Sequence, residues 1–336
     1  IDLRSFIILK EASMKLTKLV VLILAMAMVC SFTFASAQQE STAKEKIVVG
    51  FSQIGAESAW RVANTESIRS EAAKRPNIEL IFSDAQQKQE NQIKAIRNFI
   101  AQGVDVIAFS PVVESGWEPV LREAKAAGIP VILSDRAVDV EDDTLWVTFM
   151  GSDFVEEGRR AGDWLIKKLA GKPANVVELV GTVGSAPAND RYSGFREAIK
   201  GNPEIKIIKS QSGDFTRAKG KEVMEAFLKA EGENIDVLYA HNDDMALGAI
   251  QAIEEFGLKP GTDIIIVSID AVRGAFEAMV EGKLNCTVEC SPLLGPQLFD
   301  AVEALVAGET IPKRIVTNEG VFPQEVAEKV LPTRTY

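Results

Sequence analysis

The sequence predicts an α/β protein made of two similar lobes, each a doubly wound parallel sheet, joined by a hinge. Three observations support this fold class. Short runs rich in β-branched residues alternate with longer amphipathic segments, the alternation occurs twice along the 336 residues, and polar side chains gather where the predicted strands end. A chain of this length is long enough for two ordinary domains.

The first 37 residues differ in character from the rest. Lys15 and Lys18 precede an apolar run at 19–28, and the small residues Ala-Ser-Ala at 35–37 follow it. This order is typical of a secretory signal peptide that starts at Met14 and is cleaved after residue 37. The apolar run is shorter than the roughly 20 residues of a membrane-spanning helix. We therefore expect residues 1–37 to be upstream residues plus a signal peptide, and the mature protein to be exported to the periplasm.

Charge and cysteine content exclude several classes of partner. The formal net charge is −11, and loss of residues 1–37 makes it −13, which argues against nucleic acid as a partner. Cys286 and Cys290 are four positions apart in a predicted strand, so their Cα atoms would be about 13 Å apart, too far for a disulfide. With a single histidine, His241, they predict no metal site.

The elements follow one another in two sets. The first five predicted strands are residues 46–52, 78–83, 104–110, 129–134 and 145–150. Helices are expected at 89–102 and 117–127, because apolar residues recur at helical spacing and Gly103 and Gly128 follow. The second five predicted strands are residues 175–180, 205–210, 235–240, 263–269 and 284–289, with helices between them at 218–230 and 245–256. A lobe-to-lobe hinge is expected around 151–153, where no helix separates the sets.

Polar residues lie at the ends of these strands, where open parallel sheets bind ligands. They are Ser52, Asp84, Ser110, Asp135 and Arg136 in the first set, and Asp190, Arg191, Asp214, His241, Asn242, Asp243 and Asp270 in the second. Aspartates accept and arginines donate hydrogen bonds, as a ring of sugar hydroxyls requires. Trp60 and Phe215 offer flat apolar surface for a sugar ring. The pattern favours a sugar-binding crevice between the lobes.

Structural interpretations of the same residues remain open. Asp84 and Asp243 stand just before helical segments and are candidates for N-caps. The Asp135-Arg136 pair could instead be a loop ion pair, and Trp60 ordinary core.

The sequence does not indicate catalysis. Motifs for nucleotide binding, zinc proteases and serine hydrolases are missing, and His241 has no nucleophile context, so we interpret it as structural. We expect no catalytic residue and no cofactor.

Several motifs resemble the periplasmic sugar-binding proteins of the ribose/galactose type that serve ABC transporters. They are the Asp135-Arg136 pair after 129–131, Arg191 before 193–195, the segment 242–249, and Asp270 after an apolar strand. The resemblance runs from about residue 46 to near the C-terminus. It implies the type I periplasmic binding protein fold, a monosaccharide ligand, an inner-membrane ABC permease as partner, and a monomer.

The resemblance also implies roles for individual residues. Asp135, Arg136, Arg191, Asn242 and Asp270 would bond sugar hydroxyls. Trp60 and Phe215 would stack on the ring, and Arg61 and Ser110 would line the rim. Ser52, Ser58 and Cys290 complete the expected ligand-binding set.

Four stretches, 49–53, 86–92, 116–121 and 211–217, look most like the family members that bind galactofuranose. They imply galactofuranose, or a related hexose or pentose, as the ligand. Ribose-binding members carry paired Phe residues in place of Trp60-Arg61 and an amide in place of Cys290, which argues against ribose itself.

The family fold implies that the chain crosses between lobes near Asp153, Ser291 and Asn318. The first lobe would then contain 46–152 and 291–318, and the second 153–290 and 319–336. Ligand that touches both lobes would stabilise a closed arrangement recognised by the permease.

Three other functions remain open. One is a sugar sensor that presents its ligand to a chemoreceptor. Another is the effector-binding domain of a LacI-like regulator, which would need an N-terminal helix-turn-helix where this chain has the predicted signal peptide. The third is a sugar-processing enzyme with Asp135 and Asp270 as acid and base.

Overall fold

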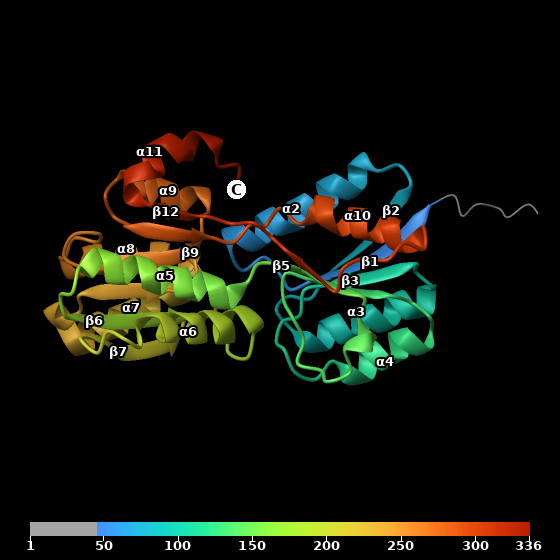
Figure 1. Ribbon diagram of the computed structural model, residues 1–336, viewed down its shortest axis with the longest axis horizontal. Coiled ribbons are helices and arrows are strands. Elements are labelled where there is room, and N and C mark those ends of the chain that lie inside the picture. Colours follow the sequence, from blue (N-terminus) through green and yellow to red (C-terminus); the bar gives the residue numbers. More distant parts are fainter. Residues whose placement is uncertain (1–45) are drawn as a thin grey trace, which may run out of the picture. The chain divides into compact units, whose positions relative to one another are not determined.

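The computed structural model describes residues 46–336, which form one compact unit (Figure 1). The predicted signal peptide and cleavage site lie outside the described residues. None of the helices within 46–336 has the length and apolar character needed to cross a membrane.

The first sheet has six parallel strands in the order β11-β5-β4-β3-β1-β2. Its strands are β1 (Ile47–Gln53), β2 (Ile78–Asp84), β3 (Val106–Phe109), β4 (Val131–Ser134), β5 (Thr148–Gly151) and β11 (Arg314–Val316). Its helices are α2 (Ala59–Lys74), α3 (Gln89–Gln102), α4 (Glu118–Ala126) and α10 (Gly295–Val306), with a 3-10 turn η1 (Asp143–Leu145). Helices α2 and α10 cover one face of this sheet, and α3 and α4 cover the other (Figure 1).

The second sheet has the order β12-β10-β9-β8-β6-β7, in which only β12 is antiparallel among the described strands. Its strands are β6 (Ala174–Val180), β7 (Ile205–Ser212), β8 (Val237–Ala240), β9 (Ile265–Asp270), β10 (Cys286–Glu289) and β12 (Val321–Pro323). Its helices are α5 (Phe154–Leu169), α6 (Ala186–Ile199), α7 (Arg217–Glu231), α8 (Asp243–Phe256), α9 (Arg273–Val280) and α11 (Ala327–Val330), with 3-10 turns η2 (Gly232–Asn234), η3 (Gln324–Val326) and η4 (Leu331–Thr333).

Successive side chains of a strand point to opposite faces of its sheet and pack into a core on each face. In β3, Val106 packs with the core beneath α2 and α10, whereas Ile107 and Phe109 pack with the core beneath α3 and α4. A strand buried on both faces is therefore continuously apolar, as parallel sheets require. This is why the predicted strands agree with the observed ones to within a few residues.

The structure bears out one predicted helix end and corrects two others. Gly103, at φ 65°, ends α3 as expected, because glycine enters the left-handed region without strain. Asp84 is the last residue of β2 and accepts a hydrogen bond from Gln86 N, so it caps no helix. Asp243 is the first residue inside α8, and the cap is Asn242, whose Oδ1 accepts from Met245 N. Both N-cap predictions were wrong.

The chain passes between the sheets three times. The passages follow β5, which ends at Gly151, β10, which ends at Glu289, and β11, which ends at Val316. One carboxylate joins all three, since Glu319 Oε1 accepts from Ser152 Oγ at 2.6 Å and from Ser291 N at 2.7 Å.

Candidate functional site

A cavity of about 290 Å³ lies where loops from the carboxyl ends of both sheets meet. Ten of the twelve residues predicted to bind ligand line it: Ser58, Trp60, Arg61, Asp135, Arg136, Arg191, Phe215, Asn242, Asp270 and Cys290. Ser52 and Ser110 lie outside the lining. Both are fully buried, and the Ser110 hydroxyl donates to Ser134 O at 2.7 Å, so it is used within the first sheet.

Three lining residues were not predicted, namely Glu57, Phe154 and Pro187. Glu57 belongs to the polar stretch after β1, and Phe154 directly follows the first passage between the sheets. The sequence shows where these residues lie along the chain, but not which way their side chains point.

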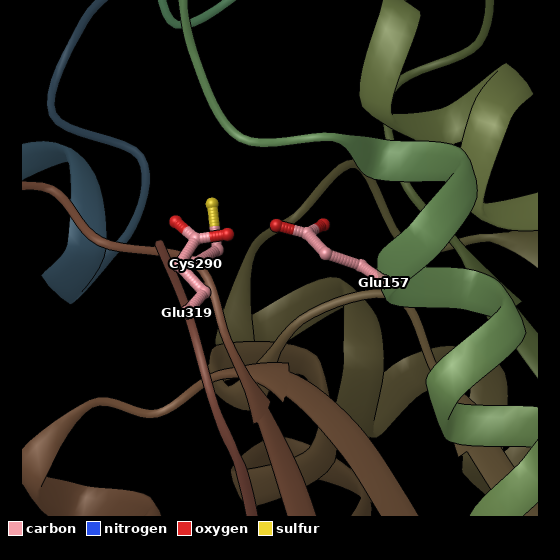
Figure 2. A group of neighbouring side chains, drawn as sticks. All are labelled: Glu157, Cys290 and Glu319. Carbon is pink, nitrogen blue, oxygen red and sulfur yellow. The ribbon is translucent and has the colours of Figure 1, made fainter. Parts of the chain in front are cut away.

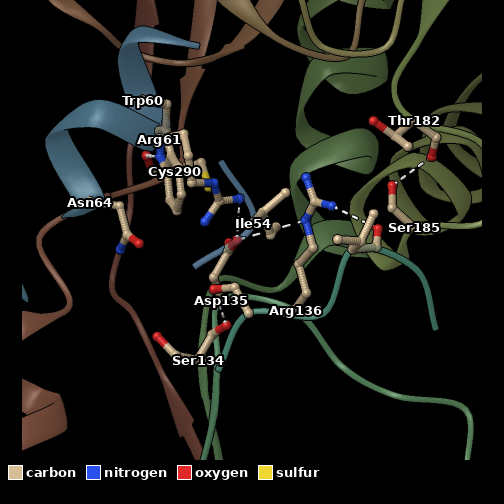
Figure 3. Close-up of polar contacts among 12 residues, drawn as sticks. Ile54, Trp60, Arg61, Asn64, Ser134, Asp135, Arg136, Thr182, Ser185 and Cys290 are labelled. Atoms are coloured by element: carbon tan, nitrogen blue, oxygen red, sulfur yellow. Dashed lines mark hydrogen bonds and ion pairs between the residues drawn. The ribbon is translucent and has the colours of Figure 1, made fainter. Parts of the chain in front are cut away.

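The first lobe contributes a compact group of alternating charges. Asp135 Oδ2 lies 2.7 Å from Arg61 Nη2 and 3.8 Å from Arg136 Nε (Figure 3). Glu57 Oε1 lies 3.1 Å from Arg61 Nε. Arg136 Nη1 donates to Val112 O at 3.0 Å. Burial, together with the charge of Arg61, lowers the pKa of Arg136 to about 10, so it remains cationic at neutral pH. These contacts hold the charged side chains in place, so that they present donors and acceptors to the cavity at fixed positions.

Arg191 holds the second lobe's charges together. Its Nε lies 2.7 Å from Glu157 Oε2, its Nη1 donates to His241 O at 2.6 Å, and its Nη2 lies 3.4 Å from Asp270 Oδ1. Burial raises the pKa of Asp270 well above its usual range despite the nearby guanidinium. A neutral Asp270 carboxyl can donate a hydrogen bond as well as accept one.

Aromatic rings form the apolar part of the wall. Trp60 and Phe215 are both nearly fully buried, and Phe154 joins them in the lining. Trp60 Nε1 donates to Cys290 O at 2.6 Å, which fixes its ring next to the second lobe. Figure 3 shows Trp60 on α2 beside Cys290. These rings provide the flat surface that the apolar face of a sugar ring needs.

Both polar atoms of the Asn242 side-chain amide form hydrogen bonds within the protein. It caps α8 through Oδ1, and its Nδ2 donates to Phe215 O at 3.1 Å. An amide nitrogen carries two hydrogens, so one remains to contact a ligand.

His241 lies behind the cavity and does not line it. Its Nε2 is 3.2 Å from Glu178 Oε1, both side chains are fully buried, and burial lowers the pKa of the imidazole. His241 therefore belongs to the buried interior of the second lobe and not to the cavity wall.

Glu157, Cys290 and Glu319 form a cluster whose potential metal-ligand atoms lie within 4.8 Å of one another (Figure 2). Burial raises the pKa of each, that of Glu319 to about 8, so Glu319 and Cys290 favour their protonated forms at neutral pH. The Arg191 guanidinium bonded to Glu157 adds positive charge beside the cluster. The arrangement therefore favours a hydrogen-bonded network over a metal centre. Cys286 and Cys290 are both free thiols.

Direct contacts also join the lobes around the cavity. Ala59 N donates to Asp244 Oδ2 at 2.7 Å, and Glu114 N donates to Gly184 O at 2.9 Å. These contacts hold the two lobes together beside the cavity.

Comparison with known proteins gives a consistent result. Residues 49–310 match the model of the periplasmic binding protein domain family. The galactofuranose-binding protein YtfQ of Escherichia coli is 55% identical over 288 residues, which cover 85% of this chain and 90% of that protein.

Solved structures agree in fold as well as in sequence. A Mycobacterium smegmatis protein in complex with β-D-fucofuranose is 56% identical, with a TM-score of 0.84, over 86% of this chain and 95% of that one. The periplasmic binding protein component of the arabinose ABC transporter from Shewanella sp. ANA-3, bound to α- and β-L-arabinofuranose, is 54% identical with a TM-score of 0.83 over the same shares. The predicted type I fold is confirmed. The chain belongs to the periplasmic binding protein family.

Proposed function

We propose that this protein captures a monosaccharide in its furanose form, galactofuranose or a related hexose or pentose, and delivers it to an ABC permease. The observation that carries the proposal is the cavity between the lobes, in which buried charged donors and acceptors from both lobes surround an aromatic wall. The similarity to proteins named for galactofuranose, fucofuranose and arabinofuranose supports the choice of ring form.

In this proposal the twelve predicted residues have four roles. Asp135, Arg136, Arg191, Asn242 and Asp270 bond the sugar hydroxyls, and Trp60 and Phe215 stack on its ring. Ser58, Arg61 and Cys290 complete the wall, while Ser52 and Ser110 act only by supporting it. Selectivity follows because an unmatched buried polar group costs about 1–3 kcal/mol.

The lobes 46–152 with 291–318, and 153–290 with 319–336, are proposed to close on the sugar as two rigid bodies. The closed form would be the one that an inner-membrane permease recognises, with the protein acting as a periplasmic monomer and not as an enzyme. Export through the N-terminal signal peptide belongs to the same proposal.

Titration calorimetry of the sugar-free protein tests this function. We expect binding of galactofuranose or arabinofuranose that is at least about tenfold tighter than binding of galactopyranose, ribose or glucose. Asp135→Ala should weaken it by about 10–100-fold, because it removes a charged acceptor worth about 1.5–3 kcal/mol. Asp139→Ala, at an exposed aspartate outside the cavity lining, is the matched control. Absence of heat with every sugar, or a preference for pyranose rings, would contradict the proposal.

A further inference from the structure

A second chamber of about 550 Å³ adjoins the cavity described above. Its lining residues come from both lobes: Ile54, Glu57, Gln87, Val112, Arg136, Thr182, Asp214, Thr216 and Lys219. Glu57 and Arg136 line both the inner cavity and this outer chamber, so the two spaces meet at these side chains. Figure 3 shows Arg136 from the first lobe and Thr182 from the second.

Two atoms of the shared side chains lack a hydrogen bond, although one of them, Arg136 Nε, lies 3.8 Å from Asp135 Oδ2. Glu57 Oε2 and Arg136 Nε are buried, and neither forms a hydrogen bond with any of residues 46–336. Both side chains are only 3–4% exposed. A buried donor or acceptor without a partner costs about 1–3 kcal/mol, so these atoms favour a ligand that places oxygens at the junction of the chambers.

The outer chamber itself is polar but has no excess of charge. Asp214 and Glu57 offset Lys219 and Arg136. The Gln87 amide forms no side-chain hydrogen bond within the described part of the chain, and the same is true of the Thr182 hydroxyl. Balanced charge with spare amide and hydroxyl groups suits an uncharged polyhydroxy group better than a phosphate or a carboxylate.

The two chambers differ in their walls and in their access to solvent. The inner cavity is lined by buried charged groups and by the buried rings of Trp60, Phe154 and Phe215, which suits one sugar ring. The outer chamber is larger and is bordered by half-buried or exposed residues such as Thr182 and Lys219, so a second ring on the same ligand would extend into it.

We propose that the protein also binds a furanosyl disaccharide, with one ring in the inner cavity and an uncharged second sugar in the outer chamber. The oxygens around the glycosidic link would lie at the junction, where Arg136 Nε donates and Glu57 Oε2 accepts. This inference rests on the proposed binding of a furanose in the inner cavity, and extends the ligand class from monosaccharides to short furanose-containing glycans.

Calorimetry on the full sugar-free protein tests the inference with two ligands, galactofuranose and a disaccharide of two linked galactofuranose rings. Thr182→Trp narrows the outer chamber, and Val183→Trp adds the same side chain at a neighbouring position that is 73% exposed and outside both linings. We expect the parent protein to bind both ligands. Thr182→Trp should weaken the disaccharide at least about tenfold and change galactofuranose less than about twofold, and Val183→Trp should change neither.

The outcomes separate this inference from the proposed function. Binding of galactofuranose without binding of the disaccharide overturns the inference and leaves the function intact. Disaccharide binding that Thr182→Trp does not weaken, or equal weakening of both ligands, overturns the placement of the second ring. Failure of both ligands to bind the parent protein contradicts the proposed function itself.

Discussion

The two lobes have the same strand order but balance their buried charges differently. Around Asp135 the first lobe sets two guanidiniums, Arg61 and Arg136, against two carboxylates. In the second lobe, Arg191 is bonded to both Glu157 and Asp270, and the pKa values of both acids are raised by burial. The first lobe therefore pairs two cations with two acids, whereas the second shares one cation between two acids. A common fold thus supports two kinds of polar surface.

The largest expected effect comes from removing Arg191. Arg191→Ala takes the bonded cation from two buried acids at once, and we expect a loss of about 3–5 kcal/mol in the free energy of unfolding without sugar. Arg61→Ala should lower the free energy of unfolding by less, because Arg136 remains 3.8 Å from Asp135. Urea unfolding of both variants measures the difference, with the half-exposed Arg97→Ala as a control within about 0.5 kcal/mol of the parent. An equal or larger loss in Arg61→Ala would refute the contrast between the lobes.

An intermediate effect is expected where helices of the second lobe cross. A Cβ on Gly194 in α6 would lie 2.0 Å from Val155 O in α5, backbone that cannot move aside cheaply. Gly194→Ala should therefore destabilise the protein by about 1–3 kcal/mol and also weaken sugar binding, since α6 carries Arg191. Gly201→Ala, where a Cβ meets no atom within 4 Å, should lose no stability. Thermal unfolding and calorimetry provide both readouts, and similar behaviour of the two variants would show that the close crossing is unimportant.

The smallest expected effect is a change in the slope of the unfolding free energy against pH. Because the pKa of Asp270 is raised in the folded protein, the native state holds a proton that the unfolded chain releases above about pH 4. Raising the pH toward the folded pKa therefore lowers stability, by at most about 1.4 kcal/mol per pH unit from this group.

Asp270→Asn should flatten the fall in unfolding free energy between pH 5 and 8 without sugar, while Asp139→Asn should keep the parent slope. An unchanged slope in Asp270→Asn would mean that Asp270 is ionised in the folded protein and that the contrast with Asp135 is smaller than described.

Local pattern was enough to predict most of the fold. Apolar strands such as β3 and the glycine that ends α3 follow from periodicity and backbone preference. The three-residue strands β11 and β12 carry no such pattern, and the crossings beside them were expected only from the family resemblance.

The site was harder to predict where tertiary contacts decide the role of a residue. Asp243 looked like a cap, yet its carboxylate accepts from Ser268 Oγ and Thr287 Oγ1 on neighbouring strands, and Asn242 one position earlier caps the helix. Glu57 was missed for another reason: its i,i+4 spacing allows an ion pair with Arg61, but nothing in the local sequence shows that this pair faces a cavity.

Because the chain returns to the first lobe late in the sequence, this lobe can finish folding only late in synthesis. Helix α10 packs on α2, and β11 completes the first sheet beside β5, although more than 150 residues separate β11 from β5 along the chain. The second sheet likewise gains its last strand only at Val321–Pro323. Lobes in many proteins fold as they emerge, from the N-terminus onward, but here neither sheet can be completed until its last strand, at 314–316 or 321–323, has been synthesised. For a chain that we propose is exported, this delay keeps an unfolded, translocation-competent state available until that point.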